Sequence, residues 1–219
     1  GETPTAEVVQ TEDPPAATST PFSPPEVPDQ ESSIDEVIAE LEGIPIEDFF
    51  DASYTQLLLR KPELLTELNL SAHFGLRNNQ LNNISDAYLK DTQRLEAAIL
   101  SQLLAYDRGS LTPDQQLSYD IYQWTLEDMV DGHEFMYHNY PLTHFINSYN
   151  FNLTTLLEEL HPLNTPKDAE DYIQRLSQVE NQVDQLLEGL AIREEMGIIP
   201  PSFIITMGRS TLADYIGLR

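Results

Sequence analysis

The sequence predicts an all-α protein in which antiparallel helices form a bundle-like array behind an acidic, proline-rich tether. From Ile34 onward apolar residues recur at intervals of three and four, period-two strand patterns are scarce, and several helix boundaries carry capping residues. About 40% of the 219 residues are hydrophobic, which is enough for a packed core. We therefore divide the chain into a disordered tether over residues 1–33 and a helical domain over 34–219.

The tether prediction rests on composition. Residues 1–33 contain seven prolines and seven carboxylates but no Lys or Arg, so they cannot bury enough apolar surface to offset the entropy of ordering. Such a segment suits a domain held away from a membrane or cell wall, although an ordinary disordered tail has the same composition. An extracytoplasmic location, with a lipid anchor at a removed N-terminus, is the expectation that follows.

Two apolar stripes mark the first helices. Each residue has another member of its stripe three or four positions away, as residues on one face of a helix do. The first stripe contains Ile46, Phe49, Phe50, Tyr54, Leu57 and Leu58, and the second contains Ile84, Tyr88, Leu95, Ile99 and Leu103.

Thr-Pro pairs at Thr112 and Thr165 indicate two helix starts. In each, threonine caps the helix and proline occupies its first position. The second start opens a predicted helix of about 30 residues, roughly 45 Å long, which stops at Gly197. Short connections, such as Asp107 to Ser110, favour antiparallel neighbours. The expected buried side of the long helix holds Tyr172, Leu176, Val179, Val183, Leu186 and Leu190.

The helix that begins after Thr112 carries the only tryptophan, Trp124. Leu117, Ile121 and Trp124 are spaced four and three residues apart, so they project from one face. We expect this face, including Trp124, to lie in the core.

Charge and composition exclude several classes of function. Asp and Glu outnumber Lys and Arg by 37 to 11, a balance that repels nucleic acid and anionic lipid. The absence of cysteine excludes disulfides and thiolate zinc sites. No apolar run reaches the ~18 residues needed to cross a bilayer, so no transmembrane segment is expected.

The segment HEFMYH, residues 133–138, approaches the H-E-x-x-H pattern of zinc enzymes. Its histidines lie five residues apart, which places them about 140° apart on a regular helix, whereas an i, i+4 pair lies about 40° apart. We therefore predict no metal site at His133, His138 and His144. An aromatic-rich turn that lines a cleft is the favoured interpretation, and its candidate cleft-lining residues are Tyr137, His138, Tyr140 and His144.

Catalytic motifs are otherwise absent from the sequence, since it contains no nucleophile elbow, phosphate loop or dinucleotide fingerprint. Paired carboxylates such as Glu158-Glu159 are typical of solvated helix faces in so acidic a chain. We predict no catalytic residue and no cofactor-binding residue in this sequence.

From Asp48 to Pro201 the chain resembles the N-terminal half of the bacterial family known as domain of unknown function 885. The resemblance is carried by FFDASYTQLLLRKPELLTELNL (49–70), by the run from LNNISDAYLK to YPLTHF (81–145) and by that from LHPLNTPKDAE to GIIPPSF (160–203). Members resemble zinc-dependent peptidases with a mostly helical fold around a deep cleft, and many are exported or lipid-anchored.

The resemblance implies that the zinc motif, of the type H-E-x-x-P-G-H, belongs to a C-terminal half, and nothing in these residues matches it. The expected role is therefore the helical scaffold and cleft wall of an exported zinc-metallopeptidase-like protein, inactive alone. Zinc is expected only in a full-length relative, and the expected partners are the missing C-terminal half and a peptide substrate. The alternative is a stand-alone helical protein-binding or scaffolding domain with an acidic surface.

The tether prediction is tested by hydrogen exchange and limited proteolysis. Residues 1 to about 33 should exchange their amide hydrogens at near-random-coil rates, because they lack apolar anchors. Their removal by a protease should leave the melting temperature unchanged. Strong protection of any amide before Asp29 would contradict the prediction.

Overall fold

The computed structural model describes residues 33–144, 148–215 and 217, and these residues form helices and no β-strand. The prediction of an all-α, bundle-like array is confirmed. In chain order the elements are α1 (Ile34–Glu40), α2 (Ile46–Leu59), α3 (Pro62–Glu67), α4 (Asp86–Leu103), the 3₁₀ turn η1 (Arg108–Ser110), α5 (Pro113–Asp131), the 3₁₀ turn η2 (Gly132–Phe135), α6 (Tyr149–Thr155), the π-helical turn η3 (Leu156–Leu160), α7 (Pro166–Leu176), α8 (Val179–Glu195) and α9 (Ser202–Tyr215).

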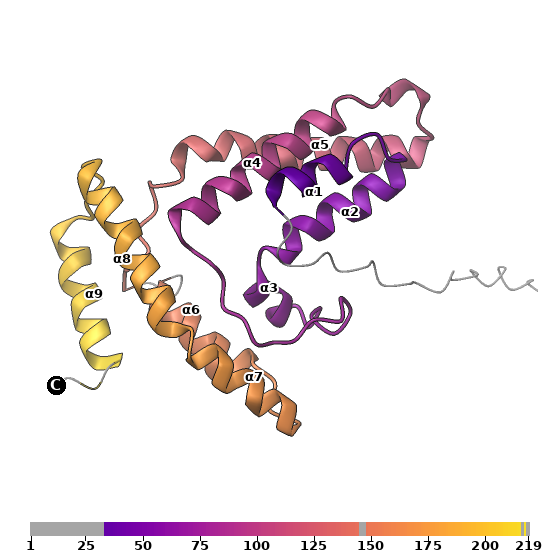
Figure 1. Cartoon of the computed structure of the whole chain (residues 1–219). Coiled ribbons are helices and arrows are strands. Elements are labelled where there is room, and N and C mark those ends of the chain that lie inside the picture. Colours follow the sequence, from indigo (N-terminus) through magenta and orange to yellow (C-terminus); the bar gives the residue numbers. More distant parts are fainter. Residues whose placement is uncertain (1–32, 145–147, 216, 218–219) are drawn as a thin grey trace, which may run out of the picture.

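The helices fall into two groups (Figure 1). Helices α1, α2, α4 and α5 lie together and share the largest apolar core, while α6 to α9 form the other side of the molecule. A smaller apolar cluster joins α6 and η3 to Leu81, which precedes α4. The core residues of the first group are Val37, Leu41, Ile46, Phe49, Leu57, Leu95, Ile99, Leu103, Tyr119 and Leu126.

The predicted helix starts agree with the structure. The side chain of Thr112 accepts a hydrogen bond from the backbone of Gln115, whose side chain bonds back to Thr112, and Thr165 and Asp168 make the same reciprocal pair. Ser33 caps α1 in this way as well. The rest of the predicted tether, residues 1–32, lies outside the described residues.

The prediction of one helix of about 30 residues after Thr165 is wrong. Helix α7 ends at Leu176 and α8 begins at Val179, although the two continue in nearly one line (Figure 1). The end of α8 near Gly197, whose φ is +74°, is as expected. None of the described helices has the length and apolar content required to cross a membrane.

The buried side of α7 and α8 also differs from the expected one. Leu176 is 44% exposed, and the buried residues are Asp171, Arg175, Gln182 and Leu186, of which only Leu186 was expected. The physical reason is that Arg175 and Gln182 bind backbone carbonyls of another segment, and Asp171 accepts from the guanidinium of Arg77. Burial therefore follows hydrogen bonding here and not apolar periodicity.

The prediction that Trp124 belongs to the core is likewise wrong, because its side chain is 69% exposed. Leu117 and Ile121 are exposed with it. Helix α5 carries a second stripe, in which Tyr119 and Leu126 are buried against α4 and its neighbours. Periodicity places residues on faces, but it does not say which of two apolar faces meets the core.

The two stripes of α5 can be told apart by mutation. Trp124→Ala should change the free energy of unfolding by no more than about 0.5 kcal/mol, because an exposed side chain leaves no cavity. Leu126→Ala, on the same helix and fully buried, should cost about 2 to 5 kcal/mol. Urea unfolding of both variants measures the difference, and equal losses would contradict the structure.

Candidate functional site

The candidate site is built on the segment 76–85, which runs without helix from the α3 region to the start of α4 (Figure 1). Backbone N–H and C=O groups outside helices need other partners when they are buried. Side chains from α7 and α8 supply most of these partners. The Nε2 group of Gln178 donates to the carbonyl of Asn79 at 2.7 Å, and its Oε1 accepts from the N–H of Leu81 at 3.0 Å.

Gln178 directly precedes α8, and two glutamines within α8 continue this pattern. Gln182 donates from Nε2 to the carbonyl of Asn82 and to a carboxylate oxygen of Glu63, both at 2.9 Å. Gln185 accepts from the N–H of Ile84 at 2.9 Å. Because positions 178, 182 and 185 are four and three residues apart, the three amides lie on one face of the helix and meet consecutive parts of the segment.

The fully buried Arg175 binds the segment between the two backbone groups that Gln178 holds. Its Nε donates to the carbonyl of Gln80 at 2.9 Å, and its Nη2 donates to the hydroxyl of Thr66 on α3. Burial lowers the pKa of Arg175 to about 10, and the carboxylates of Glu63 and Asp171 oppose this shift. The guanidinium is therefore charged at neutral pH.

His161 completes the surroundings of this arginine. Nη1 of Arg175 lies 2.9 Å from Nδ1 of His161, and Nε2 of His161 lies 3.0 Å from the carbonyl of Asp168. Because a guanidinium can only donate and a carbonyl can only accept, the imidazole proton in this arrangement is on Nε2. The buried histidine thus serves as an acceptor for the arginine.

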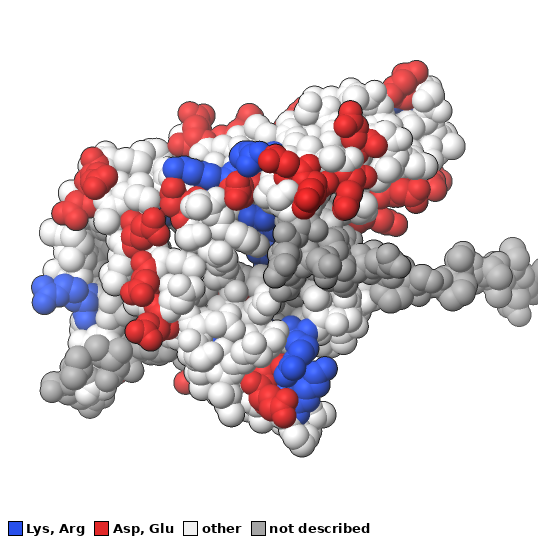
Figure 2. Space-filling view, viewed as in Figure 1, with Lys and Arg blue, Asp and Glu red and all other residues white. Residues whose placement is uncertain are grey.

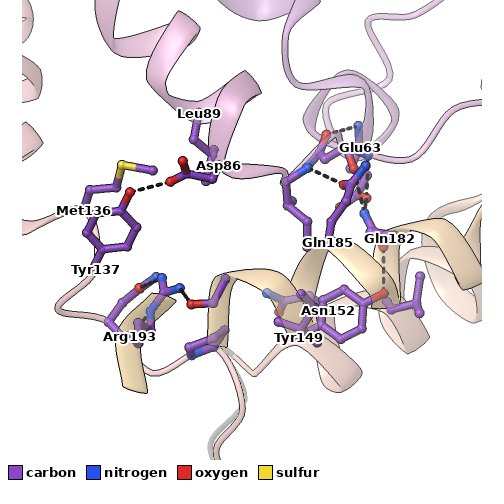
Figure 3. A pocket seen from close by; sticks show the side chains of 17 residues that line it. Glu63, Asp86, Leu89, Met136, Tyr137, Tyr149, Asn152, Gln182, Gln185 and Arg193 are labelled. Atoms are coloured by element: carbon purple, nitrogen blue, oxygen red, sulfur yellow. Dashed lines mark hydrogen bonds between the residues drawn. The ribbon is translucent and has the colours of Figure 1, made fainter. Parts of the chain in front are cut away.

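A pocket of about 350 Å³ opens beside the glutamine row. Figure 3 shows Glu63, Gln182, Tyr149 and Asn152 on one side of it, and the hydroxyl of Tyr149 donates to Gln182 at 2.9 Å. The residues that line it are Glu63, Asn82, Ile84, Asp86, Leu89, Met136, Tyr137, Asn139, Pro141, Tyr149, Asn152, Leu153, Gln182, Gln185, Leu186, Gly189 and Arg193.

The opposite side of the pocket carries Asp86 and Tyr137 (Figure 3). Lys90 at 2.7 Å and the hydroxyl of Tyr137 both bond to Asp86, and they hold the pKa of this carboxyl below its usual range. The folded pKa is thus lower than the unfolded one, so these bonds stabilise the fold at neutral pH. That contribution is lost as the pH falls through the folded pKa.

Arg193 closes the pocket from the end of α8. Its guanidinium donates to the backbone carbonyls of Asn139 at 3.1 Å and Gly189 at 2.8 Å, and it lies 5.7 Å from the ring centre of Tyr137. A Cβ atom at position 189 would lie 3.2 Å from Nη1 of Arg193. Glycine there leaves room for the arginine to fold back along its own helix.

The four residues expected to line a cleft do not gather in one place. Tyr137 lines the pocket beside the glutamine row, while Tyr140 lines a smaller neighbouring one of about 120 Å³. His138 is exposed, and its ring meets that of Phe135 in a T-shaped contact. His144 is half-buried and lines neither pocket.

The two histidines of HEFMYH also contact different partners. Residues 132–135 form the 3₁₀ turn η2, so the segment does not keep an α-helical register. His133 lies 2.7 Å from a carboxylate oxygen of Glu96 on α4. Within the described residues no three His, Asp or Glu side chains are grouped as metal ligands.

Sequence reasoning missed the amides of the site. Gln182 has both ends of its amide bonded, but Nε2 of Gln185 and the side-chain amide of Asn152 make no hydrogen bond within the described part of the chain. The available signal was the spacing of the glutamines at 178, 182 and 185. Without the position of the segment 76–85, that spacing is equally typical of a solvated face.

Comparison with known protein families shows which family the chain belongs to. A profile described as a bacterial protein of unknown function, DUF885, matches residues 62–219. The chain belongs to this family. The DUF885 match contains α3 to α9, and with them every residue that lines the pocket, while α1 and α2 precede it. Searches of curated proteins and of solved structures found no match.

Replacement of Arg175 tests how the site is held together. Arg175→Met should cost about 3 to 5 kcal/mol of unfolding free energy, because it leaves buried acceptors and carboxylates without their cation. Arg94→Met is the matched control, since Arg94 bonds to Asp35 and Asp91 at the surface and should change stability little. Similar urea midpoints for the two variants would contradict the role of Arg175.

Proposed function

We propose that this chain is the helical scaffold and cleft wall of a zinc-metallopeptidase-like DUF885 protein, and that the pocket beside α8 binds a peptide segment. Zinc and its ligands would come from the C-terminal half of such a protein, since these 219 residues contain no zinc motif. The chain alone should therefore bind peptide without cleaving it. An extracytoplasmic location, supported by the composition of residues 1–33, belongs to the same proposal.

The observation that carries the proposal is the way three glutamines at and within the start of α8 bind the protein's own backbone. Gln178, Gln182 and Gln185 bind the non-helical segment 76–85 mainly through main-chain groups, which every peptide has. Side-chain amide groups also remain available in the pocket, where Nε2 of Gln185 and the amide of Asn152 have no bonded partner in the described residues. Such amides can bind a second backbone regardless of its sequence.

The size and walls of the pocket support a short peptide. A volume of about 350 Å³ is near the lower end of the range for small-molecule sites. Leu89, Met136 and Leu186 supply apolar contacts for side chains, while the amides supply orientation. The charged groups Glu63, Asp86 and Arg193 are already bonded within the protein, so a ligand needs no charge of its own.

Peptide binding is tested by NMR titration of the chain with acetyl-tetra-alanine amide. Amide resonances of α6 and α8 around the pocket should shift in a saturable manner. Asn152→Leu keeps the side-chain size but removes the amide, and it should weaken binding about three- to tenfold, the value of one hydrogen bond. Asn152 is exposed, so the variant should fold normally.

The matched control is Asn181→Leu, at an exposed position of α8 that does not line the pocket. It should bind the peptide as the parent does. Shifts that avoid the pocket, or equal affinities for the two variants, would rule out the proposed site.

A further inference from the structure

A second hollow lies between α2 and α5, and it is more apolar than the peptide pocket. It encloses about 970 Å³, and its walls include Phe50, Leu57 and Leu58 from α2 and Ile121 and Met129 from α5. Both helices pack against α4, which also packs against α1, so the hollow is a groove along one side of this group of four helices. An additional helix would fit beside α2 and α5 as a further member of the bundle.

Contacts between the two walls define the groove. The hydroxyls of Ser53 on α2 and Tyr122 on α5 lie 2.9 Å apart, and the ring of Phe50 meets that of Tyr122 edge-on at 5.9 Å. These contacts fix the distance between the helices. The groove is therefore formed before any partner arrives.

Exposed apolar side chains extend from the groove onto α5. Leu117, Ile121 and Trp124 are 61%, 58% and 69% exposed and share one face of the helix, and Ile121 also lines the groove. On the opposite wall Tyr54 is 55% exposed. Large aromatic side chains contribute much of the binding energy at protein interfaces, and contiguous apolar surface of this kind marks interaction sites.

The charges around the groove are acidic. Glu47 and Asp51 line it, and no Lys or Arg does so among the described residues. Asp114 and Asp128 continue the face of Leu117 and Trp124 at its two ends, following the same helical spacing. Figure 2 shows that Asp and Glu also dominate the upper part of the molecule, where α1, α2, α4 and α5 lie.

This charge decides between possible occupants. A second copy of the chain brings a net charge of −26, and residues 1–33 carry seven carboxylates and no Lys or Arg. Both would meet the acidic rim with the same sign of charge, which is unfavourable. A complementary occupant must present apolar side chains flanked by basic ones.

We propose that the groove between α2 and α5 binds an amphipathic helix of a partner protein, whose apolar face is bordered by Lys and Arg. The apolar face fills the groove and covers Trp124, and the basic residues meet Asp51 and Asp128 at its edges, as in other helix-in-groove complexes. The groove shares no residue with the peptide pocket. The two proposals can therefore be tested independently.

Trp124 is the only tryptophan in the sequence, so its fluorescence reports directly on this surface. The probe is a peptide of leucine and lysine about 18 residues long, roughly five helical turns, with leucine at every third or fourth position. Binding should shift the emission of Trp124 to shorter wavelengths in a saturable manner. The affinity should fall as salt is added, because charge attraction at the rim is screened.

Ile121→Gln should weaken peptide binding about tenfold or more, because it removes an apolar side chain that the helix buries. Leu187→Gln is the matched control at a position 56% exposed on α8, and it should bind as the parent does. Circular dichroism confirms that both variants are folded. Asp51→Asn combined with Asp128→Asn should reduce the salt dependence.

Three outcomes would overturn the proposal. The first is an unchanged Trp124 spectrum, and the second is equal binding by a peptide with the same composition but no apolar face. The third is a concentration-dependent dimer in sedimentation that Ile121→Gln abolishes, because this result would assign the groove to a second copy.

Discussion

The arrangement of the two helical groups depends on how the backbone of residues 76–85 is satisfied. This segment has no helix of its own, and it connects α3 with α4 while it lies against α7 and α8. Gln178, Gln182, Gln185 and Arg175 provide hydrogen bonds to its N–H and C=O groups across about 100 positions of sequence. A buried backbone group without a partner costs several kcal/mol, so these side chains determine where α7 and α8 can pack.

The same constraint explains why a cation is buried there. Arg175 offers donors in several directions from one planar group, and it meets Gln80, Thr66 and His161 at once. A neutral amide has too few donors for that task. The charge is tolerated because Glu63 and Asp171 lie near it, and Glu63 links the arginine electrostatically to the pocket that it also lines.

The sequence predicted those features that are set by neighbouring residues. The caps at Thr112 and Thr165 could be read because each depends on a side chain three positions away. The burial of Leu126 and the exposure of Trp124 could not be predicted from the sequence. Helix α5 has two apolar faces, and only its packing against α2 and α4 determines which of them is buried. The contacts of Gln178 were equally hidden, because its partners are distant in sequence.

The distribution of polar and apolar side chains follows from these contacts. Polar side chains are buried along α7 and α8 because they find hydrogen-bond partners there. The apolar stripe on α5 stays exposed because no described residues pack against it. In the pocket, Gln182 has every polar group bonded, and Gln185 is held by its oxygen alone. A ligand that accepts from Gln185 therefore meets an amide whose orientation is already fixed. Little conformational entropy remains to be lost on binding.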